Sequence, residues 1–355
     1  MKRVGNGKVV GGIGGKGCFW PSVARLADGR LAVAYSGGRL NHICPFGRVE
    51  ISYSSDEGEH WSPGAVVLDT PLDDRDAGII RWKDKAVLTT FNNTAAFQRE
   101  CLGKWQGAWT EGERAFLNAY LNSLPADAEE KYLGSLIAVS DDGEHFDSFV
   151  KVPVSAPHGP VVLEDGSLLY IGKAFSGGQT WTDTPLGGGL YAIRSEDGKN
   201  WTAPLPLPGY DLPLFEPSAA EIGEGHVLAA ARAHGKNGEL TIVLSDSFDG
   251  GRTFSPFRPT GFCGAPPHLL ARGKEVILTY GRREPPFGIR ARVSRDGGQS
   301  WSEELALRED GTDWDLGYPC SAFLKDGSIL TVYYMKAPGK KLPEIQYTVW
   351  TAEKE

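Results

Sequence analysis

The chain has 355 residues, including 46 glycines, 23 prolines and 10 tryptophans, a composition that favours many short strands over long helices. Its formal net charge is −8, and charges of both signs are scattered without a basic stripe or polybasic patch. Nucleic acids, membrane surfaces and polyanions are therefore not expected as partners, except small anions held in a pocket.

Six similar units follow one another, each with a short first strand, a turn and a strongly aliphatic second strand. The first strands begin near Trp20-Pro21, Asp76, His158, Glu216, His268 and Tyr318. Counted from Pro21, the starts lie 55, 82, 58, 52 and 50 residues apart. A period near fifty is what a four-stranded propeller blade requires. We therefore predict an all-β, six-bladed β-propeller spanning residues 1–355 as one domain, with the stretch around Val9 completing the last blade.

A second motif, Ser-x-Asp-x-Gly-x-x-aromatic, occurs five times, out of phase with the first. The copies around Asp56, Asp249 and Asp296 match the template throughout. In the other two, Val139 stands for the serine, and Arg194 and Glu196 stand for the serine and aspartate. Asp and Gly suit tight turns, the carboxylate accepts amide hydrogens, and the aromatic fills the gap beneath the turn. The motif predicts hairpin clasps that stabilise the fold.

The long interval holds residues 92–134, where Thr110–Leu121 begins with Thr-x-x-Glu and has apolar residues at helical spacing. We expect a helical insertion in the second blade. It could form a lid over the central opening, with Trp105, Trp109 and Tyr120 touching a sugar. The alternatives are a surface decoration or a contact that makes a homo-oligomer.

The first strand of each blade lines the central channel of a propeller, so residues at the same end of these strands converge in space. They are Trp20, Asp76 preceded by Arg75, His158, Glu216, His268 and Tyr318. This ring is more polar than six equivalent core positions should be. The alignment therefore predicts a ligand site at one end of the channel.

Together these features resemble the sialidase superfamily, which combines six blades, clasps called Asp-boxes, a tyrosine nucleophile and a glutamate that activates it. The segment Gly317–Gly327 resembles the nucleophile strand and places Tyr318 at the tyrosine. Glu216 resembles the activating glutamate, and Arg232 resembles the second of three arginines that hold the substrate carboxylate. Arg283 or Arg290 would be the third.

The chain departs from the family at two places. The family's Phe-Arg-Ile-Pro is replaced by Phe19–Ser22, with Trp20 at the first arginine, so Arg39, Arg48 or Arg75 would have to substitute. The family's acid/base aspartate lies in a loop of the first blade, and the matching loop, Gly38–Arg48, has no carboxylate. The nearest replacement is the cluster Asp73–Asp76, of which Asp76 is the candidate, with His42 or His158 behind it.

The resemblance implies a retaining exo-glycosidase that removes a terminal acidic sugar, such as sialic acid or a related carboxylated sugar. Tyr318 would attack, Glu216 would activate it and Asp76 would protonate the leaving oxygen. One alternative is a polysaccharide lyase or divergent glycosidase that uses His158 or His268 with Tyr318 on uronates. Another is a non-catalytic carbohydrate-binding propeller.

Cofactor, metal and compartment are constrained by further patterns. The five cysteines are odd in number and lack metal-ligand spacing, and no metal or phosphate-loop motif occurs. The N-terminal residues lack the apolar core of a signal peptide, and no run of apolar residues is long enough to cross a membrane. We expect no metal, no cofactor and a cytoplasmic protein, or a secreted one if a signal peptide was removed.

Overall fold

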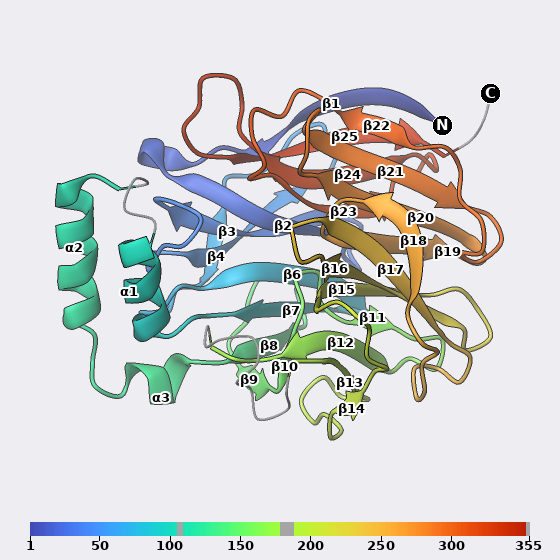
Figure 1. Ribbon diagram of the computed structural model, residues 1–355, viewed down its shortest axis with the longest axis horizontal. Helices are drawn as coiled ribbons and strands as arrows, with labels where there is room; N and C mark the ends of the chain where they lie inside the picture. The colour runs from blue at the N-terminus through green and yellow to red at the C-terminus, as the bar shows by residue number, and fades with distance from the viewer. Residues whose placement is uncertain (105–108, 178–187, 353–355) are drawn as a thin grey trace.

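Six antiparallel sheets surround a central channel in the computed structural model, which describes residues 1–104, 109–177 and 188–352 (Figure 1). The prediction of a six-bladed propeller is confirmed. Each blade runs outward from its first strand, which lies on the channel. No helix in the described part of the chain is long and apolar enough to cross a membrane.

The strands divide among the blades in chain order. Blade one contains β2 (Gly17–Arg25), β3 (Leu31–Arg39), β4 (Arg48–Ser54) and β5 (Ala65–Leu68), after a short 3-10 turn at Ile13–Gly15. Blade two contains β6 (Arg75–Trp82), β7 (Lys85–Phe91), β8 (Ser135–Ser140) and β9 (Phe149–Val152). Blade three contains β10 (Val154–Ser155), β11 (Val161–Val162), β12 (Leu168–Ala174), β13 (Leu190–Ser195) and β14 (Leu205–Pro206).

The last three blades are regular. Blade four contains β15 (Leu214–Glu221), β16 (Val227–His234), β17 (Leu240–Ser247) and β18 (Arg258–Cys263). Blade five contains β19 (Pro267–Arg272), β20 (Glu275–Arg282), β21 (Gly288–Ser294) and β22 (Leu305–Arg308). Blade six contains β23 (Gly317–Phe323), β24 (Ile329–Met335) and β25 (Glu344–Thr351).

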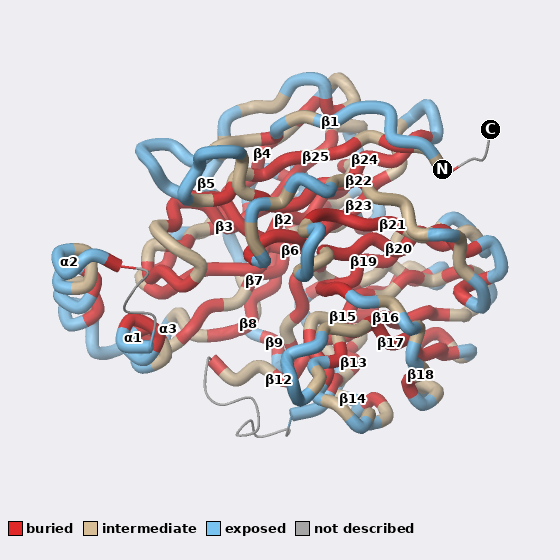
Figure 2. The backbone as a smooth tube through the Cα atoms, turned by 45° about the horizontal axis from the view of Figure 1, so that its top comes forward, coloured by how far each residue is buried: buried red, intermediate tan, exposed pale blue. Residues whose placement is uncertain are grey.

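The N-terminal strand closes the ring, as predicted. β1 (Lys2–Val10) pairs antiparallel with β25, from Lys2 opposite Thr351 to Val10 opposite Ile345. The two ends of the chain therefore share one sheet, and β25 is not left as an open edge. Figure 2 shows that the inner strands are buried, whereas β1 and the outer turns are more exposed.

The repeated turns are hydrogen-bonded clasps. In the first, Ser54 Oγ donates to Asp56 Oδ1 at 2.8 Å, and the same carboxylate oxygen accepts the His60 amide at 2.9 Å. The expectation that Val139 and Arg194 begin two of them is wrong. There the serines are Ser140 and Ser195, which donate to Asp142 and Asp197, because these copies have one residue fewer between Asp and Gly.

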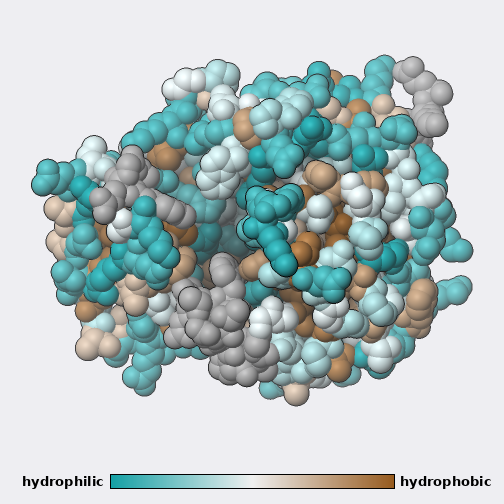
Figure 3. Space-filling view, viewed as in Figure 1, coloured by the Kyte–Doolittle hydropathy of each residue, from teal (hydrophilic) through white to brown (hydrophobic). Residues whose placement is uncertain are grey.

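The described residues of the insertion between β7 and β8 form three helices, α1 (Ala95–Lys104), α2 (Glu111–Asn122) and α3 (Ala128–Tyr132). Thr110 and Glu113 form the predicted capping box of α2. The amphipathic helix α2 lies on the outside, where Tyr120 contacts Phe46 at a ring separation of 4.7 Å. In Figure 3 the surface is hollowed between the insertion, at the left, and the central blades.

Candidate active site

The same backbone irregularity occurs near the start of four inner strands. Trp20, Asp76, Glu216 and Tyr318 all have positive φ, between 47° and 53°, although none is glycine. At each, the pairing with the second strand of the blade skips residues, as in a β-bulge. Bulges redirect side chains, and residues in this backbone region are rare and concentrate at functional sites. Four of the six predicted positions therefore share one level of the channel.

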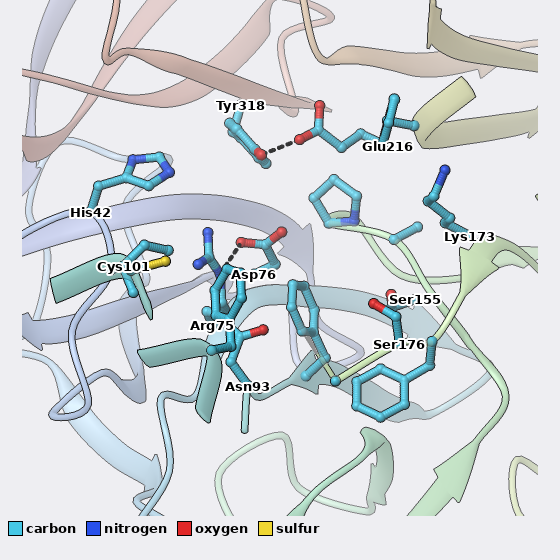
Figure 4. Close-up of a pocket in the computed structure, with 18 of the residues that line it drawn as sticks. His42, Arg75, Asp76, Asn93, Cys101, Ser155, Lys173, Ser176, Glu216 and Tyr318 are labelled. Atoms are coloured by element: carbon cyan, nitrogen blue, oxygen red, sulfur yellow. Dashed lines mark hydrogen bonds and ion pairs between the residues drawn. The ribbon is translucent and has the colours of Figure 1, made fainter. Parts of the chain in front are cut away.

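A cavity of about 380 Å³ opens at this end of the channel. This volume lies within the range of small-molecule sites. Its wall includes three of the predicted catalytic residues and three of the predicted arginines, namely Tyr318, Glu216, Asp76, Arg75, Arg232 and Arg283. Figure 4 shows Tyr318 pointing toward Glu216 on one side of the cavity, with Asp76 and Arg75 on the other side.

Tyr318 and Glu216 form a direct pair. The Tyr318 hydroxyl donates a hydrogen bond to Glu216 Oε1, and Arg232 Nη1 lies 3.1 Å from Glu216 Oε2. Burial raises the pKa of Tyr318 well above its usual value, and the negative charges of Glu216 and Asp76 raise it further. The phenol is therefore neutral, and a carboxylate already accepts its hydrogen.

Three guanidinium groups converge on this pair. Arg232 lies opposite Phe215 on the neighbouring strand, and Arg75 stacks over the Trp20 ring at 4.0 Å from its centroid. Arg283 follows β20, donates from Nε to the Leu316 carbonyl at 3.1 Å and lies 5.5 Å from the centroid of the Tyr318 ring. Such planar cations suit a carboxylate ligand.

Asp76 is a buried carboxylate beside a cation. Its Oδ1 lies 3.6 Å from Arg75 Nε. Burial raises the pKa of Asp76 to about 6, although Arg75 opposes this shift. Four polar atoms of the cavity, Arg75 Nε, Asp76 Oδ1, Glu216 Oε2 and Arg232 Nε, are buried without a hydrogen bond to any described residue, and three of them have only ion-pair contacts, between Arg75 and Asp76 and from Arg232 to Glu216. Unsatisfied buried groups are costly, so their gathering in one cavity favours a polar ligand.

Two predicted arginines lie elsewhere. Arg290 is fully buried within blade five, where Nε donates to Glu304 at 3.0 Å and Nη2 donates to the Pro286 carbonyl at 3.1 Å. Arg39 is also fully buried and forms an ion pair with Asp73 at 2.6 Å. Both guanidinium groups have structural partners, so their assignment to substrate binding is corrected. Trp20, also predicted to bind substrate, is buried and acts as the support for Arg75.

The two histidines predicted at the axis lie deeper in the channel, on a hollow at its other end. Their rings meet edge to face at 5.0 Å, Ser22 Oγ lies 3.1 Å from His158 Nδ1, and the Ser321 amide donates to His268 Nδ1 at 3.3 Å. Burial lowers the pKa of both. Their placement as substrate-binding groups beside Tyr318 is therefore wrong, and the lyase alternative loses its base.

The insertion contributes to the cavity through a different helix from the one expected. Phe97 and Glu100 of α1 are part of the wall. Trp109 is buried inside the insertion, and the Tyr120 hydroxyl donates to the Pro71 carbonyl at 3.0 Å, so neither contacts the cavity. Trp105 lies outside the described residues.

Sequence reasoning missed two lysines of the cavity, Lys104 and Lys173, and gave little weight to His42. Lys173 Nζ donates to the Gly188 and Leu214 carbonyls at 3.0 Å, and burial, reinforced by Arg232, lowers the pKa of this lysine to about 8. His42 lines the cavity from the β3–β4 loop. Lys173 is the second-last residue of β12, whose sequence is that of an ordinary buried strand. The only sequence feature that pointed to His42 was that the loop containing it, Gly38–Arg48, has no carboxylate.

Comparison with known proteins supports the fold. No family model and no curated protein matches the chain. A protein of unknown function from Dyadobacter fermentans superposes with a TM-score of 0.77 at 22% identity, over 98% of both chains. The NanB sialidase from Streptococcus pneumoniae superposes with a TM-score of 0.66 at 14% identity, over 99% of this chain and 70% of that one. Trypanosoma rangeli sialidase in complex with sialic acid gives 0.62 at 14% identity, but this chain covers only 54% of its length. On these similarities, the chain has the sialidase-type six-bladed β-propeller fold.

Proposed function

We propose that this chain is a retaining exo-glycosidase of the sialidase type that removes a terminal carboxylated sugar. One observation carries the proposal: the hydrogen-bonded pair of Tyr318 and Glu216 shares a cavity with three guanidinium groups. A neutral tyrosine with its own base is an unusual nucleophile. It suits an anomeric centre that bears a carboxylate, which would repel an anionic nucleophile.

The cavity residues divide into binding and chemical groups. Arg75, Arg232 and Arg283 would hold the sugar carboxylate through charge-assisted hydrogen bonds. Arg75 would replace the family's first carboxylate-binding arginine, because Trp20 stands at that position and carries no charge. The Arg75 guanidinium stacks on the Trp20 indole and reaches the same cavity. The limited volume of about 380 Å³ favours a single terminal residue over an internal segment of a polysaccharide.

The reaction would proceed in two displacements. In the first, the Tyr318 oxygen forms a bond to the anomeric carbon while its proton passes to Glu216. The glycosidic bond breaks with its electron pair on the leaving oxygen, and this oxygen takes a proton from an acid in the cavity wall. Water then attacks the same carbon from the vacated face and gives a proton to the conjugate base of that acid. The leaving Tyr318 oxygen recovers its proton from Glu216, and the released sugar keeps its configuration.

The test is turnover of fluorogenic terminal glycosides, with sialic acid, its deaminated analogue and neutral sugars in one panel. We expect release from an acidic sugar, and a loss of at least about 10³-fold in kcat/KM for Tyr318→Phe and Glu216→Gln. Tyr333→Phe is the matched control, because the Tyr333 hydroxyl contacts Thr348 Oγ1 at 2.9 Å, outside the cavity.

A fluorinated substrate analogue gives an independent readout. It should label the wild-type protein covalently, and peptide mapping should place the added mass on Tyr318. Silence across the whole panel, or full activity in Tyr318→Phe, would contradict the proposal. Ultraviolet absorption of an unsaturated product would instead indicate a lyase, and binding without turnover would indicate a carbohydrate-binding propeller.

A further inference from the structure

We propose that His42, positioned by Asp315, is the acid that protonates the leaving oxygen and the base that later activates water. The inference rests on the proposed glycosidase function and names a catalytic group for it. Asp76, the candidate from the sequence, would then contact the bound sugar instead of donating the proton.

The first support is the way His42 is held. His42 Nδ1 lies 2.9 Å from Asp315 Oδ1, and the same carboxylate oxygen accepts the Tyr334 hydroxyl at 2.8 Å. The imidazole also packs edge-on against Trp20, with ring centroids 5.0 Å apart. Asp315 lies three residues before Tyr318, so the same segment of blade six carries the nucleophile and the partner of His42.

The second support is the charge state of this pair. Burial alone would favour protonated Asp315, but His42, Tyr334 and Arg283 outweigh it and hold the pKa of this carboxyl at about 2. An ionised Asp315 can only accept a hydrogen bond, so it fixes the proton of His42 on Nδ1. Proton exchange with a substrate then takes place at Nε2. Burial lowers the pKa of His42 below its usual value, Asp315 opposes this shift, and Arg75 and Arg283, the cations that face the imidazole, add to it.

The third support is the location of His42 relative to Asp76. Asp76 is buried, with only 6% of its side chain exposed, and lies beside Arg75 on the side of the cavity away from Tyr318 and Glu216. His42 retains 19% exposure on the wall opposite Lys173, as Figure 4 shows. A leaving group carries the rest of the glycan and therefore departs toward solvent. The more exposed wall is therefore the better place for its acid.

The proton balance is complete with these residues. In the first displacement, protonated His42 gives its Nε2 proton to the leaving oxygen while Glu216 takes the proton of Tyr318. In the second, neutral His42 takes a proton from the attacking water at Nε2, and Glu216 returns its proton to the Tyr318 oxygen. Each residue ends as it began, with one water consumed.

The test compares two substrates of one acidic sugar, an activated aryl glycoside and an unactivated alkyl glycoside. An activated aryl oxide leaves without a proton, so only the alkyl substrate depends on the acid. For His42→Gln we expect kcat/KM to fall by about 10²–10⁴-fold on the alkyl glycoside and by less than about tenfold on the aryl glycoside. His145→Gln, on an exposed turn, is the matched control and should change neither.

Asp315→Asn tests the positioning role. It should shift the basic limb of the kcat/KM pH profile of the alkyl substrate to lower pH, because the anion that favours protonated His42 is lost. A merely structural role would lower activity on both substrates without moving the profile. Thermal melting of each variant reports whether it folds.

Two outcomes would overturn the inference while leaving the glycosidase intact. One is an equal loss for His42→Gln on both substrates. The other is selective loss on the alkyl substrate in Asp76→Asn, which would identify Asp76 as the acid. Failure of the proposed function itself looks different, because wild-type protein would then cleave neither glycoside, and the inference would fall with it.

Discussion

Replacing Asp76 by asparagine should raise the stability of the protein relative to wild type as the pH rises toward neutrality. Burial raises the pKa of Asp76 from 3.8 to about 6. The folded state therefore binds this proton more tightly than the unfolded state, and the free energy of unfolding falls as the pH rises between these two values. A shift of about two units corresponds to about 3 kcal/mol at 1.36 kcal/mol per unit.

Asparagine does not ionise, so Asp76→Asn lacks this penalty. The free energy of unfolding of Asp76→Asn minus that of wild type should rise by about 3 kcal/mol between about pH 4 and pH 7, whatever its constant part. Equilibrium urea unfolding, followed by tryptophan fluorescence at each pH, measures this difference. The reasoning is refuted if the difference is independent of pH or shrinks toward neutrality.

Asp315→Asn provides a control of opposite sign. The pKa of Asp315 is lowered to about 2, because His42 and Tyr334 outweigh the effect of burial, so its ionisation stabilises the folded state. That contribution is complete above the unfolded pKa of 3.8 and is lost as the pH falls toward 2. The free energy of unfolding of Asp315→Asn minus that of wild type should therefore fall by about 2 kcal/mol as the pH rises from about 2 to about 5.

Three further predictions follow from the fold and the cavity. If Arg75 binds a substrate carboxylate, Arg75→Ala should lower kcat/KM by about 10–100-fold, mainly through KM, and an unchanged KM would contradict that role. Removal of residues 1–10 leaves the edge of β25 unpaired, so it should lower the melting temperature and promote aggregation in light scattering. A deletion variant as stable and as resistant to aggregation as the full chain would contradict ring closure by β1. Cys263 is exposed, whereas Cys320 is buried and burial raises its pKa to about 12. A maleimide should therefore modify Cys263 in the native protein and Cys320 only after unfolding, and labelling of Cys320 in the native protein, found by peptide mapping, would refute this.

The blades could be predicted because each one needs the same arrangement of buried inner strands and turns to pack against its neighbours. The spacing of the units and the N-terminal closing strand are visible as recurring patterns of apolar residues and turns. The template has a fixed spacing, so it was placed one residue too early on the two clasps that lack a residue between Asp and Gly. In the structure Ser140 and Ser195 still reach the aspartate two residues on, since the turn tolerates the missing residue.

Residues on the inner strands were predictable, whereas side chains from longer connections were not. Tyr318 and Glu216 follow from the equivalence of the first strands. Arg283 and Arg290 flank the same hairpin, and the sequence offers no way to choose between them. The choice depends on tertiary partners: Glu304 holds Arg290 inside blade five, whereas the Leu316 carbonyl holds Arg283 at the cavity.

The shared backbone conformation suggests how the propeller builds a site without breaking its symmetry. A positive φ at a non-glycine residue costs on the order of 1–3 kcal/mol, yet it occurs at Trp20, Asp76, Glu216 and Tyr318. Three of these side chains line the cavity, and the fourth supports Arg75. If the bulge served the fold alone, the inner strands of blades three and five would be expected to show it too, but no non-glycine residue of β10, β11 or β19 has positive φ. The strain therefore coincides with the cavity rather than with the sixfold repeat, which is the distribution expected when it is retained to aim functional groups.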